Sequence, residues 1–155
     1  MRRLLDLLAL GVVIVLLLGL LHFNRRHSER EHAIEATRLS VERIQAEVNL
    51  LRALRTVGMN DAGHPIRVDS GWFDGELPVN LLLGHRERWI DLAGPGEMMR
   101  SHPRVWQVDP ASGSEAMFWY NPVQGVVRAR VPEQSTPEEA RILYAQVNGL
   151  DRELD

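Results

Sequence analysis

The chain has 155 residues, of which 45% are apolar and 25% charged, and its formal net charge is −3. Cysteine is absent and all 18 basic residues are arginine. These absences exclude disulfides, thiolate metal sites, cysteine nucleophiles and lysine chemistry such as a Schiff base. The length is enough for one long helix and one small domain, but not for two domains.

Charge is distributed unevenly along the chain. Residues 24–57 carry a net charge of +2, whereas residues 58–155 carry a net charge of −6. Because nucleic acid binding needs concentrated positive charge, the acidic distal part argues against a nucleic acid partner. The arginines just after the first segment are better suited to contact with lipid headgroups.

The first segment, residues 1–23, is predicted to be a transmembrane anchor. From position 4 to position 21 the only charged residue is Asp6. Residues 4–23 would extend roughly 30 Å as a helix, enough to cross a bilayer core. A cleaved signal peptide is the alternative, but the run ends in LLHFNRRHSER, without a small-x-small cleavage site. Asp6 is either an interfacial residue that stays hydrated or an acid that pairs with a neighbouring subunit.

Arginines flank the apolar segment on both sides, so charge alone does not fix its orientation. A short leader before a distal domain favours an amino terminus inside the cell and an exported carboxyl-terminal domain.

Residues 24–58 are predicted to continue the anchor as an amphipathic helix. No proline or glycine occurs within residues 24–57. Apolar or small residues recur there with the three-four spacing that buries one helix face. We call this face the seam: Ile34, Thr37, Val41, Ile44, Val48 and Leu51. A second set widens the apolar face towards the carboxyl end, as expected if the far half lies on a sheet: Ala46, Leu50, Ala53, Leu54 and Val57.

Residues 59–155 are predicted to form a small antiparallel sheet with a carboxyl-terminal helix, which makes the fold class α+β. Candidate strands, separated by turn signals, are residues 66–69, 88–92, 105–108, 116–120 and 125–131. The last two would form a hairpin through a turn containing Asn121, Pro122 and Gly125.

The final helix has a clear start signal. Thr136 is the expected N-cap, Pro137 takes the first helical position and Glu139 completes a capping box. Its buried face would consist of Ala140, Leu143, Tyr144 and Val147.

The sequence contains few residue patterns that would support catalysis or metal binding. His27 and Glu31 lie one helical turn apart, a spacing that a metal could use, but a hydrated helix face explains them better. The tryptophans all lie in the distal part and are expected in its core rather than in a ligand site. We therefore predict no catalytic residues, no metal, no cofactor and no small-molecule substrate, and do not expect an enzyme.

The layout resembles that of type IV pilins and the pseudopilins of type II secretion. In those proteins an apolar helix with an early acid continues as an amphipathic half packed on a small antiparallel sheet. Asp6 stands where the family has a glutamate. LPVN at residues 77–80 and FWYNPVQGVVRARVP at residues 118–132 resemble the loop and hairpin of pseudopilin-like domains. The family's leader cleavage site is not matched, since the chain begins MRRLLD.

The resemblance implies a membrane-anchored structural subunit of a pilus or a type II secretion-like filament. It would be a single-pass protein of the bacterial inner membrane, with its carboxyl-terminal domain in the periplasm or outside the cell. Its partners would be membrane lipid and other copies of itself or other pilin-like subunits. Assembly would depend on Asp6, Ile34, Val41, Ile44, Val48 and Leu51.

Two other functions remain open at this point. The same seam could form a short coiled coil with a partner membrane protein, which would make the chain a bitopic scaffold. Less favoured is an anchored ligand-binding domain that uses its tryptophans. Burial of the carboxyl half of the apolar face (Val48, Leu51 and Leu54) by the chain's own strands would favour the pilin-like function, whereas a bare face on a free helix would favour the scaffold.

Overall fold

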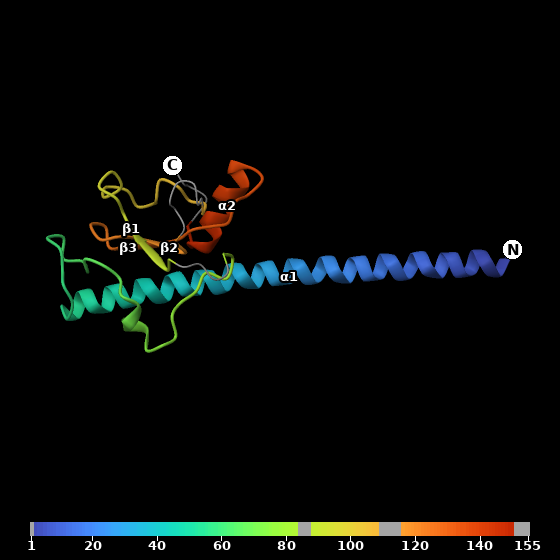
Figure 1. Cartoon of the computed structure of the whole chain (residues 1–155), viewed down its shortest axis with the longest axis horizontal. Coiled ribbons are helices and arrows are strands. Elements are labelled where there is room, and N and C mark those ends of the chain that lie inside the picture. The colour runs from blue at the N-terminus through green and yellow to red at the C-terminus, as the bar shows by residue number, and fades with distance from the viewer. Residues whose placement is uncertain (1, 84–87, 109–115, 151–155) are drawn as a thin grey trace. The chain divides into compact units, whose positions relative to one another are not determined.

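The computed structural model describes residues 2–83, 88–108 and 116–150, and for residues 2–10, 12 and 13 it describes the backbone alone. Its elements are α1 (Arg2–Leu54), η1 (Ser70–Phe73), β1 (Ile90–Leu92), β2 (Phe118–Asn121), β3 (Val126–Ala129) and α2 (Pro137–Val147) (Figure 1). The chain divides into two compact units, Met1–His32 and Ala33–Asp155. The second unit has the predicted α+β composition, with part of α1, a small sheet and a short carboxyl-terminal helix.

The long helix ends earlier than predicted. It was expected to reach residue 58, but α1 ends at Leu54. Arg55 adopts a left-handed backbone with φ +53°, and its N–H still donates to the Leu51 carbonyl over 2.9 Å. A left-handed residue directly after the last helical one is a common way to terminate a helix. The helix therefore stops four residues before the predicted end.

The sheet is mixed rather than antiparallel. Its strand order is β1-β2-β3; β2 and β3 form the predicted hairpin, whereas β1 pairs with β2 in parallel. The purely antiparallel prediction was therefore wrong at β1. Parallel neighbours need a crossover connection of a dozen residues or more. The connection over residues 93–117 provides that length, while only the β2–β3 turn is short.

Two of the five predicted strands did not form as strands. Residues 66–69 lead instead into η1, where the Asp69 carboxylate caps the helix by accepting from the Gly71 N–H over 2.9 Å. Residues 105–108 contribute only an isolated bridge between Gln107 and Val131. The other three predictions correspond to β1, β2 and β3, with shifted or shortened bounds.

The predicted start of the final helix is confirmed. Thr136 is the N-cap of α2, its hydroxyl accepts the Glu139 N–H over 3.2 Å, and Pro137 occupies the first turn. The predicted inner face is also buried: Ala140, Leu143, Tyr144 and Val147. The N-cap and the first-turn proline lie within one short segment, so the start of the helix can be predicted without knowing the tertiary structure.

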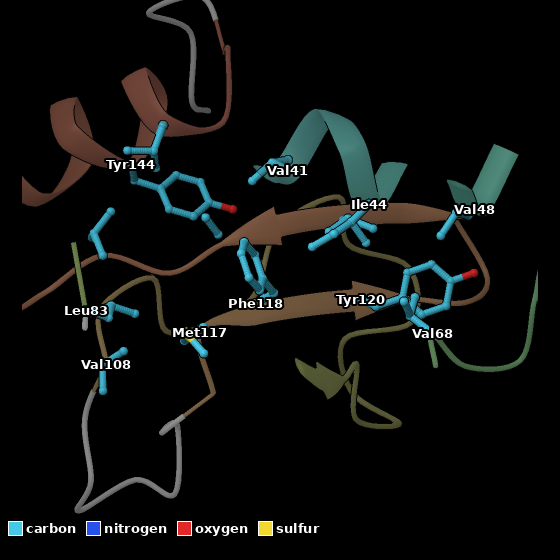
Figure 2. Close-up of a cluster of buried hydrophobic side chains, with 14 of the residues drawn as sticks. Val41, Ile44, Val48, Val68, Leu83, Val108, Met117, Phe118, Tyr120 and Tyr144 are labelled. Carbon is cyan, nitrogen blue, oxygen red and sulfur yellow. The ribbon is translucent and has the colours of Figure 1, made fainter. Parts of the chain in front are cut away.

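The core of the second unit lies between α1, the sheet and α2. Figure 2 shows Val41 and Ile44 of α1 directed at the β2–β3 hairpin, with Tyr144 of α2 on the same side. Phe118 and Tyr120 of β2 complete this cluster and are fully buried. In Figure 1 the sheet and α2 accordingly lie beside the cyan part of α1.

The predicted widening of the apolar helix face was wrong. Leu50 and Leu54 are 50% and 58% exposed, and Ala46 and Ala53 are exposed as well. The strands are only three or four residues long. So small a sheet covers a single stripe of the helix, and that stripe is the seam.

Candidate functional site

The seam is occupied by the protein's own core. Val41, Ile44 and Val48 are buried, Ile34 packs against the core from its edge, and Leu51 is half-buried. Burial of Val48, Leu51 and Leu54 was the condition that would favour the pilin-like function over the scaffold. Val48 is buried, Leu51 is half-buried and Leu54 is 58% exposed, so the condition is met in part. A coiled coil would need these same side chains to face a partner helix.

Apolar side chains in the first unit are covered by nothing that the structure describes. The exposed fractions of the large apolar residues between positions 14 and 23 run from 48% to 73%: Ile14, Val15, Leu16, Leu17, Leu18, Leu20, Leu21 and Phe23. A helix that is apolar on all sides needs an apolar environment around it. The side chain of Asp6, the predicted assembly acid, lies outside the described residues.

Within the residues that the structure describes, no helix has a stretch that is both long and apolar enough to cross a membrane. Of the predicted span over residues 4–23, positions 4–10, 12 and 13 lie outside the described side chains. The anchor therefore stays a prediction.

The second unit has an exposed apolar stripe on α1, of which the sequence had placed Leu50 and Leu54 on the buried face. Leu39, Leu50 and Leu54 are each at least half exposed. Leu39 and Leu50 are eleven residues apart, about three helical turns, so they lie on one face. That face is opposite the seam, because 3.6 residues per turn place Leu50 about half a turn from Val48. The stripe is therefore available to a neighbouring molecule.

The hairpin residues predicted from the sequence form a rigid turn. Asn121 is fully buried, and its side-chain oxygen accepts the Val123 N–H over 2.9 Å. Its amide nitrogen donates to the carbonyls of Glu97, Met98 and Arg100 at 3.2, 3.0 and 2.7 Å. Asn121 thus ties the hairpin turn to residues 97–100 of the crossover.

The two other turn residues also have defined roles. Gly125 has φ +66°, as the turn prediction required, and a Cβ at this position would collide with the imidazole of His64. The Pro122 carbonyl accepts the side-chain amide of Asn60 over 2.6 Å. The turn is thereby fixed against the loop that follows α1.

Asn80, the last residue of LPVN, joins three parts of the second unit. Its side-chain oxygen accepts the Thr37 hydroxyl over 3.3 Å and the Leu82 N–H over 3.1 Å. Its amide nitrogen donates to the carbonyls of Met117 and Arg130 at 3.2 and 2.7 Å. Asn80 is fully buried. Both asparagines of the motifs behind the family resemblance therefore hold backbone segments together.

The edge of β3 that faces away from β2 is hydrogen-bonded by two side-chain amides, one on α1 and one at the end of α2. The sequence analysis did not predict these contacts. Gln45 of α1 donates to the Gly125 carbonyl over 2.8 Å and accepts the Val127 N–H over 2.9 Å. Asn148, after α2, accepts the Ala129 N–H over 2.8 Å and donates to the Ala129 carbonyl over 3.0 Å. An open strand edge invites pairing with another chain. Gln45 and Asn148 prevent it here.

A buried ion pair connects β1 to the residue that follows β3. Arg130 Nη1 lies 2.7 Å from Asp91 Oδ2, and their side chains are only 6% and 11% exposed. Arg88 lies 2.9 Å from the second oxygen of Asp91. Because Asp91 belongs to β1 and Arg130 follows β3, the pair spans the sheet.

The His27–Glu31 pair and the tryptophans, which the sequence analysis considered for metal or ligand binding, lie in ordinary surface and core positions. His27 Nε2 lies 3.2 Å from Glu31 Oε1 on an exposed helix face, and no group of three metal-binding side chains occurs among the described residues. Trp119 is fully buried, and Trp72, Trp89 and Trp106 pack partly buried against the core. Trp72 also lines an open cleft of about 500 Å³ at the carboxyl end of α1.

Searches of protein families, curated proteins and solved structures returned no match for this chain.

Proposed function

We propose that this protein is a membrane-anchored structural subunit that assembles in the manner of a pilin or pseudopilin, in a type IV pilus or type II secretion-like filament. The observation that carries the proposal is the division of α1 into two differently used halves. Residues 14–23 expose every large apolar side chain, whereas the seam over residues 34–48 is buried against the chain's own sheet and α2.

The exposed segment supports the membrane part of the proposal. Lipid or neighbouring apolar helices would cover Ile14 to Phe23, since burying exposed apolar surface is favourable by about 25 cal/mol per Å². The arginines that follow, Arg25 and Arg26, would lie at the level of the headgroups. The acidic second unit would then stand on the outer side of the inner membrane.

The second unit supports the structural part of the proposal. Its buried polar side chains, including Asn80, Asn121 and Asn148, are engaged with backbone groups. Such side chains hold a compact domain in one conformation. The exposed stripe of Leu39, Leu50 and Leu54 offers a surface on which a neighbouring subunit would pack.

Membrane anchoring is tested by fractionating the full chain expressed in a bacterial host. Leu17→Arg places a charge in the middle of the exposed segment and should move the protein out of the carbonate-resistant membrane fraction. Leu17→Ile keeps the segment apolar and should remain in it. Equal distribution of the two variants would contradict the anchor. Protease accessibility of the second unit in intact cells then tests the orientation.

Assembly is tested by cysteine cross-linking, which is clean because the chain has no cysteine. Leu50→Cys on the exposed stripe should form cross-linked dimers and higher species in membranes, whereas Val48→Cys in the seam should not. Adding Asp6→Ala should reduce the cross-linking while leaving the second unit folded. Leu50→Cys species that stay monomeric, or an unchanged yield with Asp6→Ala, would count against assembly.

A further inference from the structure

A groove that the proposed function does not use lies between residues 104–107 of the crossover and the first turn of α2. It encloses about 310 Å³ and is lined by Arg104, Val105, Trp106, Gln107, Pro137 and Ala140. Ligand sites in proteins are concave and mostly apolar, and this volume is at the small end of their range. The groove therefore has room for a few side chains of a ligand.

The aromatic wall of the groove is held in place by α2. Trp106 stacks on the Tyr144 ring, with centroids 5.2 Å apart and ring planes 15° apart. Tyr144 is fully buried, and the His102 imidazole meets it edge-on with a centroid distance of 5.8 Å. Because the indole is already fixed, a ligand that packs against it would lose little affinity to side-chain ordering.

A second wall of the groove carries main-chain groups that are not used by the fold. Gln107 forms a parallel bridge with Val131. The Val131 N–H donates to the Trp106 carbonyl over 3.0 Å, and the Val108 N–H donates to the Val131 carbonyl over 2.9 Å. Backbone groups of an extended chain alternate in direction, so the N–H and C=O of Gln107 point away from Val131. Within the described part of the chain, neither group has a hydrogen-bond partner.

The edge of β3 that faces away from β2 is treated differently, since Gln45 and Asn148 bond to its main-chain groups. None of the described side chains bonds in this way to the Gln107 backbone. An open main-chain edge invites pairing with an extended segment of another chain. Domains that bind peptides by strand addition combine such an edge with pockets for alternate side chains. The edge at Gln107 and the groove beside it have this combination.

The charge of the groove indicates which peptides it would accept. Of the six residues that line it, Arg104 alone is charged, and neither Glu138 nor Glu139 of the first turn of α2 lines it. The Arg104 backbone N–H is held by Glu97 Oε1 over 2.6 Å, whereas its side chain is exposed and pairs with no carboxylate that the structure describes. An acidic side chain of the ligand is therefore complementary to it.

We propose that this groove binds an extended peptide segment of another protein, which adds as a strand along Gln107. An apolar side chain of the peptide would pack against Trp106, and an acidic side chain would lie beside Arg104. The groove lies wholly in the second unit, so this inference does not depend on membrane anchoring or on assembly.

The test uses the full chain in detergent micelles and two pools of acetylated hexapeptides, in which valine or leucine alternates with glutamate or with serine. In the free protein, the Gln107 amide should exchange its hydrogen faster than the Val108 amide, which is bonded to Val131. The glutamate pool should slow exchange at Gln107 at least about tenfold. Unchanged exchange at Gln107 would overturn the proposal. Protection that rises with protein concentration without peptide would assign the groove to a second copy and overturn it too.

A pair of variants at Gln107 tests the main-chain contact. Gln107→Pro removes the N–H that points away from Val131 but keeps both hydrogen bonds of the bridge, and proline is tolerated at a strand edge. It should weaken peptide binding at least about fivefold. Gln107→Ala keeps the N–H and should bind normally. Equal affinities of the two variants would contradict strand addition.

A second pair tests the charge. Arg104→Gln should weaken binding of the glutamate pool about two- to fivefold and leave binding of the serine pool unchanged. Arg104 is exposed, so this variant should fold even if Gln107→Pro does not. Arg100→Gln, which replaces an exposed arginine of the same crossover outside the groove, is the matched control. Equal effects of the two arginine variants would remove the acidic side chain from the proposed ligand.

Discussion

Replacing Asn80 with alanine is the sharpest test of how the second unit is held together. The substitution removes four hydrogen bonds that connect α1, the LPVN loop and the hairpin. It leaves the buried Arg130 carbonyl without this donor and the fully buried Thr37 hydroxyl without its acceptor, whereas the Met117 carbonyl still accepts the Arg130 N–H over 3.0 Å. An unsatisfied buried polar group costs about 1–3 kcal/mol. Since part of the site can relax, we expect a loss of about 3–4 kcal/mol in unfolding free energy.

The assay is urea unfolding of the full chain in detergent, followed by tryptophan fluorescence. Asn49→Ala is the matched control, because Asn49 is exposed on α1 and its loss should change stability by less than about 0.5 kcal/mol. Thr37→Val alone should cost about 1 kcal/mol. In the double variant Asn80→Ala, Thr37→Val the two effects should not add, since the residues share a hydrogen bond.

Two outcomes would refute this reasoning. A loss below about 1 kcal/mol for Asn80→Ala would mean that the amide bonds contribute little net stability. Full additivity with Thr37→Val would mean that the Thr37–Asn80 bond does not couple α1 to the loop.

Three further predictions test other parts of the second unit. Gly125→Val should destabilise by more than about 1 kcal/mol, because of its positive φ and the contact with His64; an unaltered melting temperature would remove the turn assignment. Arg130→Met should cost up to about 3 kcal/mol, because the Asp91 carboxylate stays buried and keeps Arg88 but loses its buried partner, and Arg130→Met with Asp91→Leu should restore part of the loss; chemical denaturation measures both. Glu97→Gln should lessen the loss of stability in acid. Burial alone would raise the pKa of Glu97. Hydrogen bonds from the backbone N–H groups of Arg104 and Gly94 outweigh that effect, so the pKa lies below the usual value for a glutamate. Its stabilisation is therefore complete above about pH 4.5 and disappears as pH falls through the lower folded-state pKa. Identical midpoints of denaturation for Glu97→Gln and the natural chain at about pH 3 and about pH 6 would contradict this.

Features whose signals lie within one segment could be predicted from the sequence. The N-cap at Thr136, the positive φ of Gly125 and the burial of Val41, Ile44 and Val48 all follow from local spacing and backbone preference. The cap and the turn depend on residues close in sequence, and the three-four spacing selects which face of the helix can be buried.

Features that depend on distant pairing could not be predicted. The parallel β1–β2 pair joins strands that are far apart in the sequence, and the turn signals between them do not fix the direction in which the strands pair. The burial of the helix face beyond Val48 was misjudged for the same reason, because the reach of the sheet depends on strand lengths that periodicity does not give. Gln45 and Asn148 offered no signal either, since an amide becomes an edge cap only once β3 lies beside it.

The exposed apolar surfaces of α1 also differ in whether the sequence alone could predict them. The sequence identified the exposed segment over residues 14–23 because an apolar run is visible without a fold. It could not reveal the stripe of Leu39, Leu50 and Leu54, since exposure is fixed only when the sheet selects one helix face.

The use of α1 connects the fold to the proposed function. If the seam were free, the chain would need a partner helix merely to fold its second unit. Because the unit buries Ile44 and Val48 by itself, what α1 still exposes is surplus to folding: the segment over residues 14–23 and the stripe around Leu50. Exposed apolar surface on an independently folded unit marks interaction with lipid or protein. Under the proposed function, the first surface would contact lipid and the second a neighbouring subunit.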